Sequence, residues 1–279
     1  MTTQTHSVVL GAGLMGRLLA HSLARLGHRV EVFEAQGSDA QGAAARVAAA
    51  MLAPLAESAI TEMPVVRMGQ HALKRWPELL LELQQPVFFQ QNGTLIVWHR
   101  QDAAEAQRFA QLLARTQNQL PSLPALQSLG NSELTDKEPA LHGRFQNALY
   151  LPDEGQLDNR QLLASLLDSL HTQNVALHWN TSKSPEDFSP GTAGQPHWVF
   201  DCRGLGARGE WQALRGVRGE VIRLHAPEVT LQRPTRLIHP RYPIYIAPKP
   251  DHVFVIGATE IETEDLSPAS VRSTLELLS

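Results

Sequence analysis

Apolar and polar positions at the start of the chain follow the order of a strand, a turn, a helix and a second strand. An apolar run at residues 7–10 ends in a G-x-G-x-x-G pattern at residues 11–16, after which leucines recur at helical spacing. A second run containing β-branched residues, 29–33, ends at Glu34. The change from a period of two to a helical period and back predicts a βαβ unit, the beginning of a parallel sheet.

The glycines and the acidic residue of this unit match the requirements of a dinucleotide-binding turn. Gly11 allows a tight turn, Gly13 lets the backbone approach a pyrophosphate, and Gly16 lets the helix pack close to the strand. Glu34 stands where an acid accepts hydrogen bonds from ribose hydroxyls, and no arginine follows it directly, which disfavours NADP. The pattern predicts a bound dinucleotide without choosing between FAD and NAD, and a glycine-rich turn in a nucleotide-free α/β protein is the alternative.

Helical spacing continues in the next part of the chain. An alanine-rich segment at residues 43–54 favours a helix and also permits the close approach of a flat ligand. Residues 64–83 are predicted to be helical, with a break before Pro77, and residues 102–120 form a second amphipathic helix.

The alternation of strands and helices that is typical of a parallel sheet is lost between residues 84 and 150. An Asn-Gly pair at 92–93 lies between two strand-forming runs, so residues 87–98 are predicted to form a β-hairpin. Residues 121–130, with proline and serine, are predicted to be a linker. This block is interpreted as part of an antiparallel domain inserted into the first domain.

The remainder of the chain predicts several strands and two helices. The glycine turn after residues 198–200 indicates a return to the nucleotide-binding sheet. One helix is expected at residues 160–173 and another from Ser267-Pro268 onward, with its apolar face formed by Val271, Leu275 and Leu278. Strands are expected at residues 148–151, 175–179, 198–200, 217–224, 237–239, 242–247 and 253–259.

The composition narrows the class of protein. The chain has 279 residues and a formal net charge of -4, which argues against nucleic-acid or anionic-membrane partners. Its one cysteine, Cys202, excludes an intramolecular disulfide, and this fits a reducing cytoplasm. No run is long enough to span a membrane, no signal peptide is recognisable, and the histidines lack metal-ligand spacing, so no metal site is expected.

The order of motifs resembles the FAD-dependent D-amino-acid oxidase family, and within it the glycine oxidases of thiamine biosynthesis. The resemblance runs through nearly the whole chain and selects FAD as the cofactor. The matching segments are residues 8–16 with Glu34, 48–54 with Glu57, 92–95, 157–163, 201–204, 218–221, 245–249 and 255–259.

The resemblance implies a fold and a domain order. The fold class is α/β, with a Rossmann-like FAD-binding domain and an inserted antiparallel-sheet substrate domain, the topology of glutathione-reductase-like flavoproteins. The FAD-binding domain is expected at residues 1–83 and 151–215, and the substrate domain at residues 84–150 and 216–279.

The resemblance also implies roles for particular residues. The glycine turn and Glu34 would hold the ADP half of a non-covalent FAD, and the segment after it would approach the pyrophosphate and the flavin. Tyr245 and Met51 would lie at the substrate, with Tyr245 reaching its carboxylate. The implied cofactor-binding residues are Gly11, Gly13, Leu14, Met15, Gly16, Glu34, Arg46, Ala49, Ala50, Met51 and Gly204.

Several positions depart from the family pattern. Arg46 lies where a hydroxyl residue is usual, Ala50 where glycine is usual, and Lys249 in place of a common arginine. Family sequences continue past residue 279, and the arginine that clamps the substrate carboxylate has no match here. A C-terminally truncated chain is therefore expected.

The expected function is oxidation of a small amino acid, glycine or sarcosine, with dioxygen as acceptor and hydrogen peroxide as product, in thiamine thiazole synthesis. An inactive remnant of the FAD fold, a D-amino-acid dehydrogenase and the oxidase domain of a tRNA-modifying enzyme are alternatives. An NAD-dependent dehydrogenase is a further alternative, although the βα alternation that it requires is missing after Glu34. His239 is given a structural or surface role, and the oligomeric state is left open, with a homo-oligomer as one option.

Overall fold

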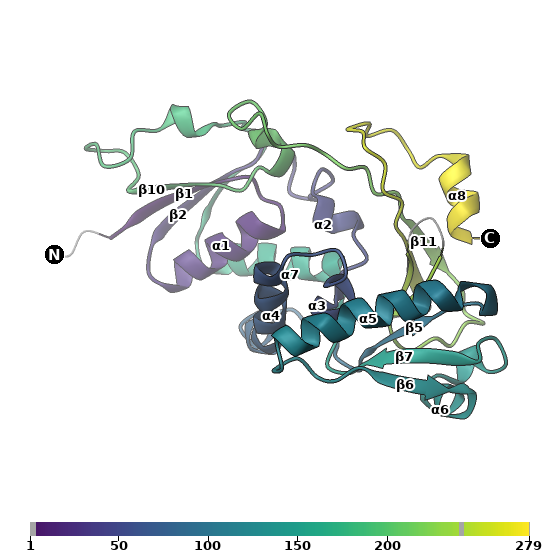
Figure 1. Ribbon diagram of the computed structural model, residues 1–279. Coiled ribbons are helices and arrows are strands. Elements are labelled where there is room, and N and C mark those ends of the chain that lie inside the picture. The colour runs from purple at the N-terminus through teal and green to yellow at the C-terminus, as the bar shows by residue number, and fades with distance from the viewer. Residues whose placement is uncertain (1–3, 240–242, 279) are drawn as a thin grey trace. The chain divides into compact units, whose positions relative to one another are not determined.

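The computed structural model describes residues 4–239 and 243–278, and the chain divides into two compact units (Figure 1). The first unit comprises Met1–Ala48, Leu81–Val87 and Asn159–Gly216, and the second comprises Ala49–Leu80, Phe88–Asp158 and Val217–Ser279. Residues 49–80 and 151–158, which the sequence grouped with the nucleotide-binding part, fall in the second unit, and residues 84–87 and 216, which it grouped with the substrate domain, fall in the first. The strands and short helices of residues 49–80 and 151–158 pair and pack with elements of the second unit, as described below.

The first unit is built on a four-stranded parallel sheet in the order β10-β1-β2-β9. Helices α1 (Leu14–Arg25) and α7 (Asn159–Thr172) pack against each other, and apolar residues of both join the core beside β1 and β2. This sheet confirms the predicted βαβ unit and the predicted return of the chain at residues 198–200. The strands are β1 (His6–Leu10), β2 (Arg29–Phe33), β9 (Ala176–His178) and β10 (Trp198–Asp201).

The second unit contains a seven-stranded sheet in the order β11-β14-β13-β12-β5-β7-β6. All of its pairs are antiparallel except the parallel pair of β12 and β5. The strands are β5 (Thr94–Val97), β6 (Gln127–Gly130), β7 (Asn147–Leu151), β11 (Ile222–His225), β12 (Thr235–Leu237), β13 (Ile244–Lys249) and β14 (Val253–Gly257).

Helices cover both faces of this sheet because its strands carry apolar side chains that point alternately to one face and to the other. Ile96 of β5 packs into a core with α3 (Pro54–Glu57) and α5 (Ala103–Gln119). Leu95 and Val97 point the other way, into a core with α6 (Asn131–Lys137). The confirmed fold class is therefore α/β, with a parallel sheet in one unit and a mainly antiparallel sheet in the other.

The predicted β-hairpin at residues 87–98 is wrong. Its first strand, β4 (Phe89–Gln90), joins a separate three-stranded sheet with β3 (Met51–Leu52) and β8 (Gly155–Leu157). Its second strand, β5, belongs to the seven-stranded sheet. Gly93, with φ of +83°, turns the chain from one sheet to the other, and the Tyr150 ring occupies the space where a Cβ at Gly93 would lie. The Asn-Gly turn thus connects strands of two different sheets, β4 and β5, and does not close a hairpin.

Three further expectations need correction. Helix α4 (Met63–Leu81) continues through Pro77, which removes one N–H donor close to the end of the helix. The alanine-rich segment is helical in α2 (Ala44–Val47) and again from Pro54, where α3 begins, because β3 lies between them and pairs with β8. The expected linker at residues 121–130 contains β6, which pairs with β7.

The C-terminal helix also differs from its prediction. Helix α8 (Val271–Leu278) begins three residues after Pro268, and the Ser270 hydroxyl accepts a hydrogen bond from the Ser273 N–H at 3.1 Å. Its expected apolar face is largely exposed, and Leu277 is the buried leucine of the helix. The strand expected at residues 242–247 begins at a residue outside the described part. Short 3₁₀ turns occupy Arg100–Asp102, Pro139–Leu141, Pro185–Asp187 and Gly204–Ala207.

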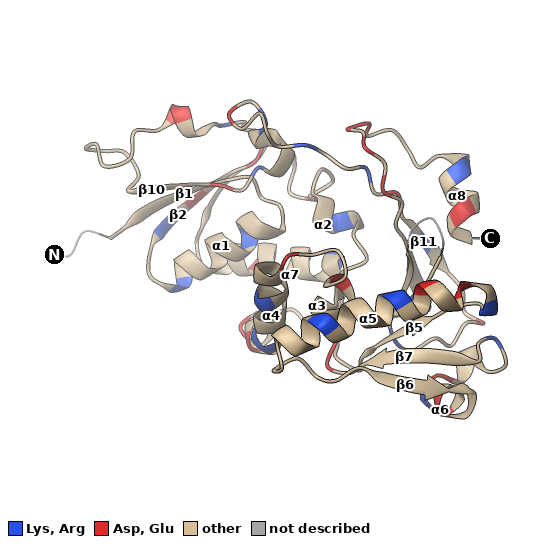
Figure 2. Ribbon diagram, in the orientation of Figure 1, with Lys and Arg blue, Asp and Glu red and all other residues tan. Residues whose placement is uncertain are grey.

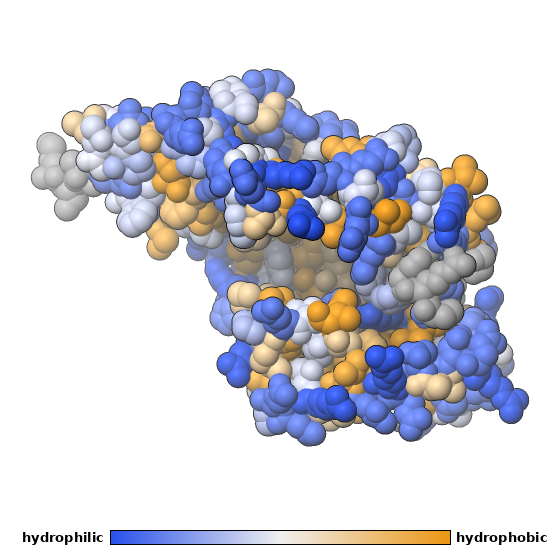
Figure 3. Space-filling view, turned by 45° about the horizontal axis from the view of Figure 1, so that its top comes forward, coloured by the Kyte–Doolittle hydropathy of each residue, from blue (hydrophilic) through white to orange (hydrophobic). Residues whose placement is uncertain are grey.

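The surface of each unit carries both signs of charge. Figure 2 shows lysine and arginine interspersed with aspartate and glutamate along the elements of each unit. The face seen in Figure 3 is mostly hydrophilic, with separate hydrophobic residues among the polar ones. Among the described residues, none of the helices has the length and apolar character needed to cross a membrane.

Candidate functional site

The predicted site residues divide between the two units. Those that the sequence assigned to the ADP half of the cofactor lie in the first unit, and the predicted substrate residues lie in the second. The first unit carries Gly11, Gly13, Leu14, Met15, Gly16, Glu34, Arg46 and Gly204, and the second carries Ala49, Ala50, Met51 and Tyr245.

The glycine turn has the geometry that its sequence pattern requires. Gly11 has φ of +92°, and a Cβ there would lie 2.7 Å from the carbonyl oxygen of Cys202. A Cβ at Gly16 would overlap the carbonyl oxygen of Gly11, so helix α1 approaches the turn more closely than any side chain permits. Gly13 is the N-cap of α1, where no side chain caps the helix and no acidic residue lies in the first turn. The helix N-terminus thus keeps its capacity to bind an anion.

Glu34 holds the turn in place from the end of β2. Its Oε2 accepts a hydrogen bond from the Ala12 N–H at 2.6 Å, and its Oε1 accepts one from the Gln36 N–H at 2.9 Å. Each carboxylate oxygen has a second lone pair, so these bonds leave acceptor capacity for further donors.

Arg17 also stabilises this turn, although it was not among the site residues predicted from the sequence. It is 1% exposed, and its guanidinium donates to the carbonyl oxygens of Ala12, Leu163 and Ser38, each at 2.7 Å. Burial lowers the pKa of Arg17, and the nearby carboxylates of Glu34 and Asp39 oppose that shift. Nothing in the local helical pattern distinguishes this arginine from one on a solvated helix face.

The other predicted residues of the first unit lie close to the surface. Met15 is 67% exposed at the start of α1. Arg46 donates from Nη1 to the carbonyl oxygen of Asp39 at 3.0 Å. Gly204 has φ of +57°, and a Cβ there would meet no heavy atom within 4 Å.

The loop that contains Arg46 is tied down by Asn159, the first residue of α7. Its Nδ2 donates to the carbonyl oxygens of Ala45 and Ala48, the latter at 2.9 Å. A buried amide that holds neighbouring backbone carbonyls gives this loop a defined conformation.

In the second unit, the residues before Met51 explain one departure from the family pattern. Ala50 has φ of +54°, a left-handed conformation that favours glycine. Its carbonyl oxygen accepts a hydrogen bond from the Leu157 N–H at 3.2 Å, which continues the pairing of β3 with β8. Glycine is therefore the less strained residue at this position, and alanine is tolerated because its side chain is small.

Met51 lines a small, largely apolar cavity in the second unit. The cavity has a volume of about 280 Å³, and Glu57 is the charged residue in its wall. The lining residues are Met51, Leu52, Ala53, Pro54, Glu57, Thr61, Val65, Val66, Gly69 and Ala72.

Glu57 belongs to a charged cluster with Arg236 and Tyr245, which face each other across β12 and β13. Arg236 is 3% exposed and donates from Nη1 to Glu57 Oε1 at 3.2 Å and to the carbonyl oxygen of Ala56 at 3.1 Å. Its guanidinium lies 5.4 Å from the Tyr245 ring centroid and 4.9 Å from that of Phe109. Its Nε is buried without a hydrogen-bond acceptor among the described residues.

The surroundings of this cluster shift the pKa values of the Glu57 carboxyl and the Tyr245 phenol. Burial raises the pKa of Glu57, Arg236 lowers it, and Glu260 raises it again. Burial also raises the pKa of Tyr245, with a further contribution from Glu57, so the phenol stays protonated and can donate a hydrogen bond at neutral pH. Arg236 lies in a strand of three residues, Thr235–Leu237, and no pattern in so short a segment could have identified it from the sequence.

A second buried acid, Glu154, fixes the start of α3. It is 2% exposed, and its Oε1 accepts hydrogen bonds from the N–H groups of Leu55 and Ala56 at 2.9 and 2.8 Å. Burial raises the pKa of Glu154 to about 7. Because α3 ends at Glu57, this buried carboxyl positions the short helix that carries the acid of the charged cluster.

Glu154 predicts a pH dependence of stability. The unfolded chain loses this proton near pH 4.5 and the folded chain near pH 7, so the folded state binds more protons in that window. The free energy of unfolding should therefore fall as the pH rises from 4.5 to 7, by up to ~3 kcal/mol from this group. Urea unfolding at several pH values should show a flatter profile for Glu154→Gln than for Glu105→Gln, a change at an exposed glutamate. Equal profiles for the two variants would contradict this role.

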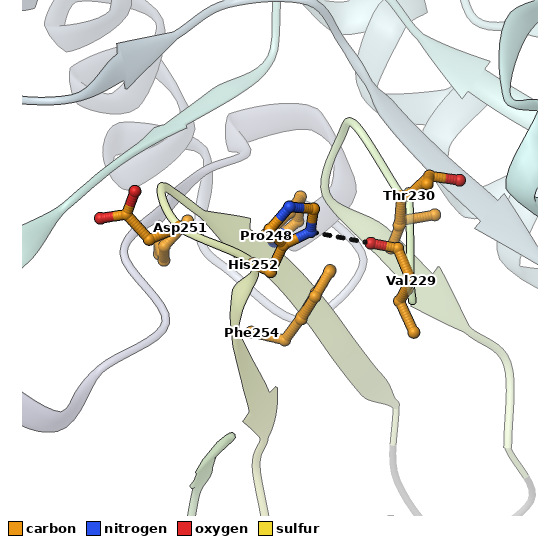
Figure 4. Close-up of a pocket in the computed structure, with 8 residues that line it drawn as sticks. Val229, Thr230, Pro248, Asp251, His252 and Phe254 are labelled. Carbon is orange, nitrogen blue, oxygen red and sulfur yellow. Dashed lines mark hydrogen bonds between the residues drawn. The ribbon is translucent and has the colours of Figure 1, made fainter. Parts of the chain in front are cut away.

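Another cavity of the second unit, of about 430 Å³, lies at the turn between β13 and β14. The imidazole of His252 lies 3.5 Å from the carbonyl oxygen of Val229, while the Asp251 carboxylate points away from it (Figure 4). Lys249, also in the lining, donates to Leu157 O at 2.8 Å and to Gln156 Oε1 at 3.2 Å, and burial lowers its pKa to about 7. These charged groups do not converge, so the cavity beside Met51 is the stronger candidate site.

Comparison with known proteins places the chain in a family. Residues 6–279 match the DAO family of FAD dependent oxidoreductases. A protein of Rhizobium etli, named as the thiamine biosynthesis oxidoreductase ThiO, is 37% identical over 272 residues, covering 97% of this chain and 76% of that protein.

Solved structures share the fold at lower sequence identity. The glycine oxidase of Geobacillus kaustophilus has a TM-score of 0.78 and 23% identity, covering 99% of this chain and 77% of that one. The glycine oxidase of Bacillus cereus has a TM-score of 0.79 and 20% identity, covering 99% of this chain and 76% of that one. With the family match over almost all of its residues, the chain belongs to the DAO family of FAD-dependent oxidoreductases, and its cofactor is FAD.

Proposed function

We propose that this protein oxidises a small amino acid, glycine or sarcosine, to the imine, which water hydrolyses to the 2-oxo acid with release of ammonia or methylamine. Dioxygen accepts the electrons and becomes hydrogen peroxide, and the product serves thiamine thiazole synthesis. The observation that carries this proposal is the 37% identity with the Rhizobium etli ThiO protein over 97% of the chain. Membership of an FAD family removes the NAD-dependent dehydrogenase alternative.

The first unit offers a fitting site for the diphosphate of FAD. The N-terminus of α1 has no side-chain cap, and its N-cap Gly13 presents backbone without a Cβ. The nearest heavy atom to a Cβ built on Gly13 would be the Cβ of Ala43, at 3.7 Å, which is an ordinary van der Waals contact. A ligand can therefore approach the backbone at Gly13. Gly11, Gly16 and Glu34 would keep this backbone in shape, and Arg46 would add a positive charge for the diphosphate.

The cofactor is proposed to be held without a covalent bond. Cys202 is partly buried, and burial raises the pKa of its thiol, with Asp201 adding to the shift. A thiol with a raised pKa is a poor nucleophile at neutral pH. The backbone of Cys202 has a structural use instead, since its N–H donates to the carbonyl oxygen of Leu10 at 2.7 Å.

The second unit would orient the substrate. The protonated Tyr245 phenol is a hydrogen-bond donor for the substrate carboxylate, and Met51 supplies apolar contact in a cavity whose size suits a small amino acid. FAD, when bound, supplies the acceptor for the hydride from the substrate Cα. The protein's own contribution is then orientation and exclusion of water, and it needs no separate catalytic base.

The test compares the wild-type protein with Gly13→Ala. Wild-type protein should bind FAD, show flavin absorbance, and release peroxide with glycine or sarcosine more than with D-alanine. Gly13→Ala should keep its unfolding midpoint, because the added methyl meets only an ordinary contact, but bind FAD about tenfold to a hundredfold more weakly. Isothermal titration of apoprotein with FAD measures this difference.

Two results would reject the proposal. Wild-type protein that ignores added FAD has no cofactor site of the proposed kind. Flavin-loaded protein that releases no peroxide with any of the three amino acids, but reduces an artificial dye with D-alanine, would be a dehydrogenase of the same family.

A further inference from the structure

The cavity beside Met51 combines an apolar wall with one carboxylate. The side chain of Glu57 is 37% exposed, so its carboxylate can contact a ligand while it remains paired with Arg236. The rest of the lining is aliphatic or small and neutral, apart from the Thr61 hydroxyl. A ligand in this cavity therefore meets a negative group and little other polarity.

The surroundings of Glu57 leave this end of the cavity short of positive charge. Glu260 and Glu154 are its acidic neighbours, and both interact with it electrostatically. Arg236 supplies the positive charge, but it lies on the buried side, where its Nη1 is shared between Glu57 and the carbonyl oxygen of Ala56. Tyr245, the remaining ionisable neighbour, stays neutral because burial and Glu57 raise its pKa.

A cation is the ligand group that complements such a carboxylate. A neutral hydroxyl in the same place could hydrogen-bond to Glu57 but would gain no charge attraction, and an anion would be repelled. Arg236 keeps the carboxylate in one orientation and favours its ionised form, so the site is prepared before the ligand arrives.

We propose that Glu57, oriented by Arg236, binds the ammonium group of the incoming substrate, which releases one proton to water before the hydride leaves Cα, and so restricts the site to amino acids over hydroxy acids. This inference rests on the proposed function and adds the residue that determines specificity at the amino end. Glu57 would touch the substrate, whereas Arg236 would act through it as a positioning residue.

The experiment measures equilibrium binding to the FAD-loaded protein, so that turnover is not the readout. Trimethylglycine carries a permanent cation and a carboxylate but cannot form an imine, because its nitrogen has no lone pair, and glycolate carries the same carboxylate with a neutral hydroxyl. Glu57→Gln keeps the shape and removes the charge. We expect it to weaken trimethylglycine binding about tenfold or more and to leave glycolate binding within about twofold.

Glu62→Gln is the matched control, since Glu62 is an exposed glutamate five residues further on and should leave both affinities unchanged. Glu57→Asp should restore part of the discrimination. Equal losses for both ligands in Glu57→Gln, or no loss for either, would overturn this proposal, and the proposed function would still stand if the wild-type protein releases peroxide. Failure of the proposed function would appear separately, as wild-type protein that takes up no FAD or releases no peroxide.

Discussion

Replacing Gly16 by alanine should abolish stable folding of the nucleotide-binding turn and, with it, FAD uptake. A Cβ at this position would overlap the carbonyl oxygen of Gly11, and a backbone atom cannot move aside as a flexible side chain can. Helix α1 would have to shift away from β1, which would also disturb the Arg17 bonds beneath the turn. We expect a loss of about 3 kcal/mol or more in the free energy of unfolding, measured by urea titration.

Gly209→Ala is the control in the same unit. A Cβ at Gly209 would meet no heavy atom within 4 Å, so this variant should stay within about 0.5 kcal/mol of wild type and bind FAD normally. A Gly16→Ala protein with wild-type stability and one FAD per chain would show that the close approach of helix and turn is dispensable.

Replacing Arg236 by methionine should destabilise the second unit strongly. The change removes the charge that offsets Glu57 and leaves that carboxylate beside Glu260. Breaking a buried ion pair by removing one partner costs roughly 3–5 kcal/mol, and partial exposure of Glu57 reduces this to about 2–4 kcal/mol. The pKa of Glu57 should rise further, because the group that lowers it is gone.

The double variant Glu57→Leu/Arg236→Met identifies the cause. If the loss in Arg236→Met comes from an uncompensated carboxylate, removing that carboxylate as well should restore about half or more of the lost stability. Arg236→Lys keeps the charge but loses the planar contact with the Tyr245 and Phe109 rings, so an intermediate stability is expected. Additive losses in the double variant would show that Arg236 acts by packing alone.

The sequence predicted the elements whose patterns are local. The glycines at positions 11 and 16 each have a steric reason that can be stated before any coordinates, and the positive φ of Gly11 and the close approach at Gly16 match those reasons. The return of β10 to the parallel sheet was also predictable, because its apolar run ends in a second glycine turn.

Features that depend on distant partners were not predictable. Asn92-Gly93 has the local signature of a hairpin, but the strands on its two sides do not pair with each other. β4 pairs with β8, whereas β5 pairs with β7 and β12. The roles of Arg236 and Glu154 depend on α3, a helix too short to leave a periodic pattern. The family resemblance supplied Met51 and Tyr245, and only the coordinates connected Tyr245 to its buried guanidinium neighbour.

The strand order of the first unit has a consequence for synthesis on the ribosome. β1 lies between β2, which emerges soon after it, and β10, whose flanking residue His197 is 191 residues from its hydrogen-bond partner His6. At a translation rate of about 5–20 residues per second, one edge of the nascent β1 waits roughly 10–40 s for its partner. Chaperones that bind extended apolar segments would have their longest opportunity at this edge.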